Sequence, residues 1–278
     1  ILDYIDPSNY YFNDGIMCFN RIELINGLYL NTNFNLNRRS SISNLNFYNW
    51  QGDFLQTALP IDFEPYNIFK TDFSLSYTPG QKYITEPTQK IVLGSRWPTF
   101  RVNYIKGWKG VFDSGVDFDQ VKFEMSQKFS LGTIGKSKYS IEVGKFVNQD
   151  SVYNIDQQFF QAGAVGITGL FMTPPSSSFQ NLEQNYSTRD VYLKFHYVHY
   201  FNGAIINKIP FMKKTGITTV GGGGMLFVSK YNNLYYQEVY FGVQRRFKIL
   251  TERLKIGGFV IFSNSNQQSP NVQFKILF

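Results

Sequence analysis

The sequence contains a single cysteine, Cys18, among its 278 residues. This number excludes both an intramolecular disulfide and a cysteine-based metal cluster. Histidine is nearly as scarce, since only His196 and His199 occur. Three positions apart on a strand, they would point to opposite faces and could not easily share a metal ion. We therefore expect no metal and no other cofactor.

Long apolar runs and charged residues are also scarce. No run of about eighteen consecutive apolar residues occurs, which excludes a transmembrane helix. Charged residues make up 17% of the chain, against about 25% in a typical soluble domain. Aromatic residues reach 18%, yet the mean hydropathy is only -0.24. A membrane β-barrel reconciles these values, because its strands alternate apolar residues that face lipid with polar residues that face the lumen.

Basic residues outnumber acidic ones, 27 to 20, which gives a formal net charge of +7. Such an excess is common in proteins that bind nucleic acid. Here, however, Lys and Arg are scattered singly along strand-like segments and form no clustered stripe for a phosphate backbone. We therefore do not expect nucleic acid as a partner.

The first residues, 1–7, lack the basic region and the apolar core of a secretory signal, and the chain does not begin with Met. An exported protein must have carried such a signal. We therefore expect a mature chain or the carboxy-terminal part of a longer precursor, in which residues 1–278 form a single barrel domain.

The last eight residues, 271–278, alternate between polar and apolar side chains. This spacing of two predicts a strand with one apolar face. The apolar residues are Val272, Phe274, Ile276 and Phe278. A soluble sheet can end in the same pattern. However, the segment closely resembles the last strand of bacterial outer-membrane barrels, whose final Phe is read by the barrel-assembly machinery. We expect an assembly signal that is also the closing strand, paired with an early strand near residues 21–30.

The same alternation recurs upstream, for example in residues 73–77, 121–125, 191–197 and 239–243. The polar positions carry long ionisable side chains, which can pair with one another in a barrel lumen. We predict that these polar residues face the lumen: Lys122, Glu124, Glu142, Lys194, His196, Arg246 and Lys255. About twelve strands can be recognised. The predicted fold is therefore all-β, a transmembrane antiparallel outer-membrane β-barrel.

Aromatic residues near the predicted strand ends fit an interfacial belt, in which the ring meets lipid and the polar atom stays wet. Ordinary packing at strand ends is the alternative. The candidates for the belt are Trp97, Tyr104, Trp108, Tyr235 and Tyr236.

The connections between the predicted strands differ in length. Residues 132–136 form a compact hairpin, whereas residues 149–186 form a long loop, which we place on the outer surface of the cell. Three lysines, at 208, 213 and 214, flank Pro210 in a turn that is either simply solvated or attracts anionic lipid headgroups. Residues 221–224 are four glycines without the Lys and Ser/Thr of a phosphate loop, and we expect them to let the strand bend or another backbone approach.

Four segments resemble motifs of a known family: FNRIE at 19–23, WPTFRVNYIKG at 97–107, FHYVHYFNG at 195–203 and NKIPFMKK at 207–214. The family is a Bacteroidota outer-membrane family that joins a carboxypeptidase-regulatory-like periplasmic domain to a carboxy-terminal barrel, and its barrels are similar to the BamA/TamA assembly-factor superfamily. The resemblance implies about sixteen strands. Two departures matter: Leu24 replaces a motif glycine, and residues 166–171 lack the Arg of the Arg-Gly-Phe lumen-loop signature. Insertase activity is therefore not implied.

We do not expect an enzyme, because the sequence places neither Ser126 nor Ser187 beside His196. The prediction is an integral protein of the Gram-negative cell outer membrane, acting as an accessory or scaffold subunit in outer-membrane protein biogenesis or transport. Its expected partners are outer-membrane lipid or lipopolysaccharide and other outer-membrane proteins in a complex. The alternatives are a passive channel or exporter for a small or lipidic solute and, third, a lipid-modifying enzyme.

Overall fold

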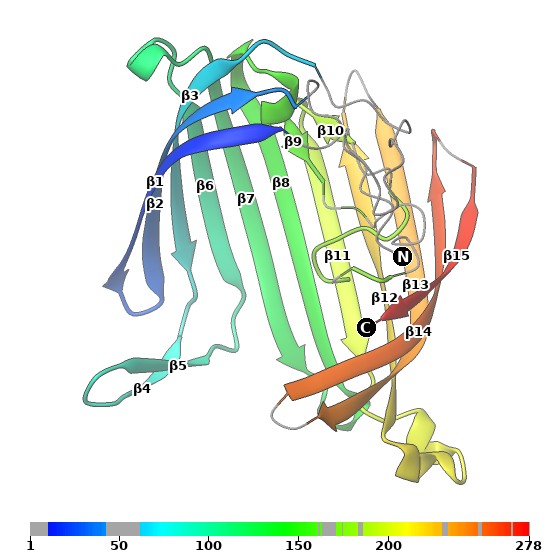
Figure 1. Ribbon diagram of the computed structural model, residues 1–278. Coiled ribbons are helices and arrows are strands. Elements are labelled where there is room, and N and C mark those ends of the chain that lie inside the picture. Colours follow the sequence, from blue (N-terminus) through cyan, green and yellow to red (C-terminus); the bar gives the residue numbers. More distant parts are fainter. Residues whose placement is uncertain are drawn as a thin grey trace. The chain divides into compact units, whose positions relative to one another are not determined.

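The computed structural model describes residues 11–42, 62–160, 162, 171–173, 175–182, 186–229, 233–249, 252–267 and 269–277. In these residues the fold is all-β with only short 3-10 turns, which confirms the all-β part of the predicted fold. The strands are labelled in Figure 1. No helix in the described part of the chain is long and apolar enough to cross a membrane.

Eleven of the described strands form one antiparallel sheet in the order β1-β2-β3-β6-β7-β8-β11-β12-β13-β14-β15. They are Phe12–Ile25 (β1), Leu28–Ser40 (β2), Tyr66–Tyr77 (β3), Thr99–Gly107 (β6), Asp117–Ser130 (β7), Lys136–Ser151 (β8), Tyr192–Tyr200 (β11), Ile217–Val228 (β12), Leu234–Ile249 (β13), Glu252–Ser265 (β14) and Asn271–Leu277 (β15). Two small sheets pair β4 (Lys82–Thr85) with β5 (Lys90–Gly94), and β9 (Gln158–Phe159) with β10 (Ser187–Thr188).

The pairing predicted for the closing strand is not found among the described residues. The strand β15 pairs with β14, from Gly257↔Leu277 to Ser263↔Asn271. The early residues near 21–30 pair with each other across the β1–β2 hairpin, as in Ile22↔Leu30. A tight two-residue turn at 26–27 explains this pairing, because it brings the neighbouring strands together locally.

The chain divides into two compact units, each assembled from segments that are distant in sequence. The first contains Ile1–Leu75, Val102–Val121 and Phe146–Gln157. It contains a buried apolar cluster of Tyr66, Ile68, Val116, Phe118, Phe146 and Val152. Beside them Arg39 forms an ion pair of 2.5 Å with Asp156, and the Tyr66 hydroxyl donates to the same carboxylate at 3.0 Å.

The second unit contains Ser76–Arg101, Lys122–Lys145 and Gln158–Phe278. The two faces of its strand β13 differ sharply. Val239, Phe241 and Val243 are 62%, 50% and 42% exposed, whereas Glu238 and Tyr240 between them are 2% and 1% exposed. We call the face with Val239, Phe241 and Val243 the outer face, and the face with Glu238 and Tyr240 the inner face. Large apolar side chains are thus exposed on the outer face, whereas the inner face buries the Glu238 carboxylate together with apolar residues such as Leu234, Phe259 and Ile261. Large apolar side chains are normally the buried ones in a soluble sheet.

The last strand shows the same difference between its two faces. Val272 and Phe274 are 60% and 58% exposed, and Lys275 between Phe274 and the exposed Ile276 is only 1% exposed. The alternation predicted for residues 271–277 is therefore confirmed, while Phe278 lies outside the described residues. Exposed apolar side chains with the same spacing occur on other strands: Phe73, Leu75, Tyr77, Val121, Phe123, Val260 and Phe262.

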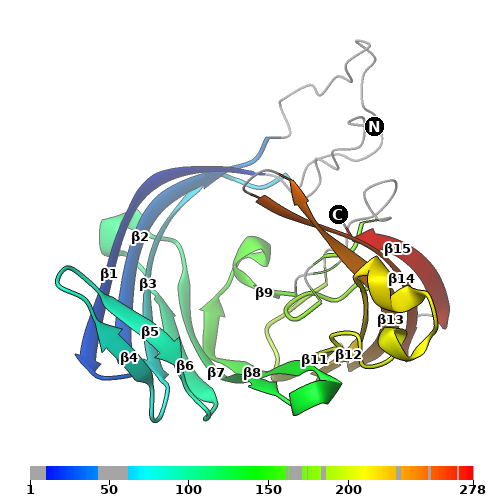
Figure 2. The same ribbon diagram turned by 90° about the horizontal axis from the view of Figure 1, so that it is seen from below.

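The connections follow the expected difference in length. A 3-10 turn at Gly132–Ile134 joins β7 to β8, which confirms the compact hairpin. Within the long connection before β11, the described residues 171–173 and 175–182 pack on the inner face of the β11–β15 strands of the second unit. Figure 2 shows this part of the chain on the concave side of those strands. Which side of a membrane the loop faces stays a prediction.

Candidate functional site

The candidate site is the contact between the inner face of β11–β15 and residues 171–173 and 175–182, which we call the inner segment. The amide of Met172 donates a hydrogen bond of 2.8 Å to the carbonyl of Ile276, so one end of the segment lies along β15. Ten residues of chain later, Leu182 is 5% exposed and belongs to a buried cluster with Phe160 and Tyr192. The segment is therefore held at both ends.

Glu238 on β13 binds the backbone of this segment. Its Oε2 accepts hydrogen bonds from the amides of Gln180 at 2.7 Å and Asn181 at 3.4 Å. The hydroxyl of Tyr236, on the same face, donates to the same oxygen at 2.7 Å. Because Glu238 is 2% exposed, these donors replace the water that its carboxylate would otherwise bind.

Lys275 on β15 binds the same stretch from the other side. Its Nζ donates to the carbonyl of Gln180 at 2.5 Å, and the side chain is 1% exposed. The amide side chain of Asn181 donates to the hydroxyl of Ser263 on β14 at 3.2 Å. The peptide around Gln180 is thus fixed between a carboxylate and an ammonium group. Buried charges of opposite sign compensate each other only when such hydrogen bonds are made.

Phe179 fills a hollow that the glycines of β12 create. Its ring is 0% exposed and lies 4.4 Å from the ring of His196 and 5.4 Å, edge on, from that of Tyr236. A Cβ added to Gly224 would come within 2.9 Å of Phe179, and one added to Gly222 would lie 2.2 Å from the carbonyl oxygen of Tyr197. The expected approach of a backbone holds at Gly222 and Gly223, where carbonyl oxygens of the neighbouring strands are close, whereas at Gly224 the approaching group is the Phe179 side chain.

Three side chains of the site have buried polar atoms that lack hydrogen-bond partners among the described residues. These atoms are both ring nitrogens of His196, Oε1 of Glu238 and Oδ1 of Asn181. His196 is 1% exposed and covered by Phe179. No group of three His, Cys, Asp or Glu side chains suited to a metal ion occurs in the described part of the chain. The contacts of the site thus hold the inner segment against the sheet.

Several residues predicted to face the lumen meet beside this site. Lys194 and Glu142 lie opposite each other on β11 and β8 and form an ion pair of 2.8 Å. The Tyr192 hydroxyl donates to Glu142 at 2.7 Å, and Lys138 donates to Ser176 of the inner segment at 3.0 Å. Glu142, Lys194 and His196 are therefore brought together on the inner face of the second unit.

The remaining predicted lumen residues lie elsewhere. Glu124 pairs with Arg101 at 2.9 Å, and Lys122 is half-buried. Arg246 and Lys255 face each other across β13 and β14, and both are exposed. They share the inner-face alternation with Glu238 but lie near the ends of their strands, which explains their contact with solvent.

Four of the five aromatic candidates are exposed: Trp97 at 65%, Tyr104 at 38%, Trp108 at 37% and Tyr235 at 41%. Tyr236 is 1% exposed and bonds to Glu238, so its predicted place in an outward belt is wrong. The physical reason is that successive residues of a strand point to opposite faces, and Tyr235 and Tyr236 cannot share one.

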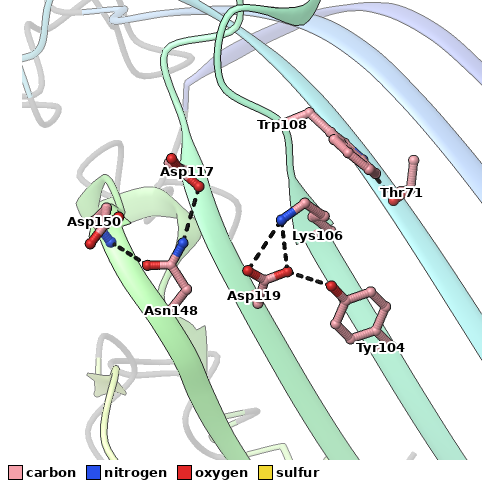
Figure 3. A network of polar contacts seen from close by, with 8 residues as sticks. All are labelled: Thr71, Tyr104, Lys106, Trp108, Asp117, Asp119, Asn148 and Asp150. Carbon is pink, nitrogen blue, oxygen red and sulfur yellow. Dashed lines mark hydrogen bonds and ion pairs between the residues drawn. The ribbon is translucent and has the colours of Figure 1, made fainter.

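Exposed aromatic side chains of the first unit keep their polar atoms paired (Figure 3). The Tyr104 hydroxyl donates to Asp119 at 2.5 Å, and Lys106 forms an ion pair with the same carboxylate at 3.0 Å. The indole nitrogen of Trp108 donates to the hydroxyl of Thr71 at 3.0 Å. Each ring thus presents an apolar surface outward while its polar atom is satisfied.

A Ser–His pair exists, but between residues other than those considered from the sequence. Ser137 and His199 lie opposite each other on β8 and β11, with Ser137 Oγ 2.7 Å from His199 Nδ1. The other ring nitrogen of His199 faces the carbonyl of Ile134 at 3.3 Å. Both side chains are buried, at 1% and 6% exposure, and among these contacts no carboxylate orients the ring. The sequence alone could not predict this pair, because it depends on how β8 and β11 are aligned in the sheet.

Residues 5–243 match the C-terminal domain of a family of unknown function, DUF5686. None of the curated proteins matches the sequence. The matched range covers the strands of the site through most of β13 and includes Glu238, while Lys275 lies beyond it.

Proposed function

The chain belongs to the DUF5686 C-terminal domain family, and on this premise we propose that it is an integral β-barrel protein of the cell outer membrane. There it acts as an accessory or scaffold subunit in outer-membrane protein biogenesis or transport. The four sequence motifs support this role, because they resemble a Bacteroidota outer-membrane family whose barrels are similar to assembly factors. The loop signature of those factors is absent, so the proposal does not include insertase activity.

The observation that carries the proposal is the row of large apolar side chains exposed on the outer face of successive strands. On β13, Phe241 is 50% exposed while Glu238 is 2% exposed, and β15 repeats the arrangement with Phe274 and Lys275. Leaving a large apolar side chain in water forfeits about 1.5–3 kcal/mol of burial free energy. Exposed apolar patches of this extent mark surfaces that meet lipid or protein. A lipid bilayer would cover such exposed apolar faces on many neighbouring strands at once.

Strand length and the exposed aromatic residues agree with a bilayer. The described strands of the large sheet have from 7 residues in β15 to 16 in β8 and β13, and β6 has 9. A tilted transmembrane strand needs about 9–11. Trp97 precedes β6 and Trp108 follows it, both exposed. Aromatic rings at the two ends of an apolar span are the expected interfacial anchors.

The inner segment favours a scaffold over an open passage. It covers part of the inner face of β11–β15 and is fixed there by Glu238 and Lys275. That part of the face is occupied by the chain itself and is not free to line a pathway for solute. Binding of partner barrels to the outer face requires no open pathway for solute.

Membrane insertion is tested by refolding the purified chain into detergent micelles and lipid vesicles. We expect it to float with the vesicles and to migrate faster on gels before heating than after. A chain that stays monomeric and soluble without detergent would overturn the proposal.

The role is tested by purifying the protein from detergent-solubilised membranes and by recording planar-bilayer conductance. A stoichiometric assembly or transport complex without steady current supports the accessory role. Isolation as a lone monomer that carries a steady ion current would instead support the passive channel.

A further inference from the structure

The turn between β11 and β12 combines a defined backbone with an exposed apolar tip. Two 3-10 turns, η6 (Ile206–Lys208) and η7 (Met212–Thr215), shape it. The amide of Met212 donates to the carbonyl of Ile209 at 3.2 Å, and Ile206 is 5% exposed. Phe211, by contrast, is 95% exposed. The turn is therefore anchored while its phenylalanine points away from the protein.

The backbone of Phe211 has a φ of 68°, in the left-handed region. A bulky residue in this region is strained and persists where the surroundings or a function require it. Nothing in the turn covers the ring in return. A residue that is both strained and exposed to this degree is better explained by a surface that it meets than by the folding of the turn.

The charges of the turn identify that surface. Lys208, Lys213 and Lys214 are exposed around Phe211, and residues 201–216 contain no acidic side chain. Ile205 and Ile209 add apolar area, at 40% and 45% exposure. Apolar residues flanked by lysines are the composition that binds the headgroup region of an anionic bilayer. A purely solvated turn would require neither the ring nor the isoleucines at the tip.

We infer that residues 205–214 bind anionic phospholipid headgroups at the bilayer surface, with Phe211 inserted into the interfacial region and the three lysines against the phosphates. The inference rests on the proposed membrane function. The turn adjoins the compact β7–β8 hairpin, since Tyr200 at the end of β11 pairs with Lys136. It therefore lies at the short-turn end of the second unit, where the apolar outer face ends.

The experiment places an environment-sensitive dye beside the ring without removing it. Ile209→Cys is labelled in a Cys18→Ser background, and the full chain is incorporated into nanodiscs of phosphatidylcholine alone or with added phosphatidylglycerol. Protection of the dye from aqueous iodide is measured. We expect protection to rise with the anionic lipid and to fall at high salt.

Three variants define the result. Lys213→Gln with Lys214→Gln should lower the ratio of protected to exposed dye by roughly 30-fold, from the contribution of two lysines near an anionic surface. Phe211→Ser should also lower it. The matched control, Lys109→Gln with Lys145→Gln, removes equal charge elsewhere and should change nothing.

Equal quenching in neutral and anionic discs would overturn this inference while leaving the membrane proposal intact, and would fit a turn that meets an acidic protein partner instead. A chain that cannot be incorporated into discs at all would overturn both.

Discussion

The carboxylate of Glu238 accepts a hydrogen bond of 2.7 Å from the backbone amide of Gln180, which lies 58 residues earlier in the chain. Because the donor is a main-chain group, the contact depends on the path of the inner segment and not on the side chain at position 180. Lys275 binds the carbonyl of the same residue. Together they fix where a long connection runs on the inner face.

Glu238→Ala should release the inner segment. The substitution leaves the Tyr236 hydroxyl and two backbone amides without their acceptor. Hydrogen bonds to a charged group contribute about 1.5–3 kcal/mol each. We expect faster cleavage within residues 171–182 under limited proteolysis, followed by mass spectrometry, with strand content by circular dichroism unchanged. Val239→Ala, on the outer face of the same strand, is the control. Equal cleavage in both variants would contradict the role of Glu238.

Gly224→Ala should displace Phe179. The new methyl group would lie 2.9 Å from the ring and 3.1 Å from His196, closer than packed atoms allow. Overpacking of this kind destabilises by about 1–3 kcal/mol. Gly221→Ala is the matched control, because its methyl would meet the flexible Phe241 side chain at 3.2 Å on the outer face. Urea unfolding in detergent measures the difference. An unchanged midpoint for Gly224→Ala would show that the hollow is not needed.

The two faces of the sheet could be predicted from the sequence because strand side chains alternate with a fixed period of two. That rule correctly separated Val272 and Phe274 from Lys275, and it needed no knowledge of which strands pair. It also carries its own check: Tyr235 and Tyr236 are neighbours, so only one of them can face outward. The prediction that both tyrosines lie in the interfacial belt is incompatible with this constraint.

The inner segment could not be predicted, because no local pattern encodes a contact made across the fold. Phe179 and Gln180 lie in a stretch rich in Pro and Ser, which is typical of an exposed loop. The partners that hold them, Glu238 and Lys275, come from distant strands. The four glycines at 221–224 were the one visible signal, since they indicated that something approaches β12 closely. The sequence did not show that it is Phe179.

Deletion of Phe278 should separate assembly in the cell from folding in the test tube. The residue ends the alternating strand 271–278, which resembles the export signal of outer-membrane barrels. We expect less of the truncated protein in the outer-membrane fraction of cells, while refolding of the purified chain into detergent stays unchanged. Immunoblots of fractionated membranes measure the amount of protein in the outer membrane. Gel mobility before and after heating measures refolding. Loss of refolding as well would mean that Phe278 is structural.

Phe241→Arg tests directly whether the outer face meets lipid. Phe241 is 50% exposed in the middle of β13. In water, a substitution at an exposed position changes stability by about 0.5 kcal/mol or less. At the midplane of a bilayer, an arginine on the lipid face of a strand costs about 2–4 kcal/mol, and near the interface about 0–1 kcal/mol.

The matched control for Phe241→Arg is Tyr235→Arg, on the same face of the same strand but at its end, where the residue is 41% exposed. Urea-dependent folding into phospholipid vesicles gives the free energy of unfolding of each variant. We expect Phe241→Arg to be the more destabilising by about 2 kcal/mol. Because the two residues have nearly equal exposure, a soluble sheet would tolerate both arginines equally. Equal effects would therefore exclude a bilayer around β13, whereas a difference that follows position along the strand has no explanation in water alone.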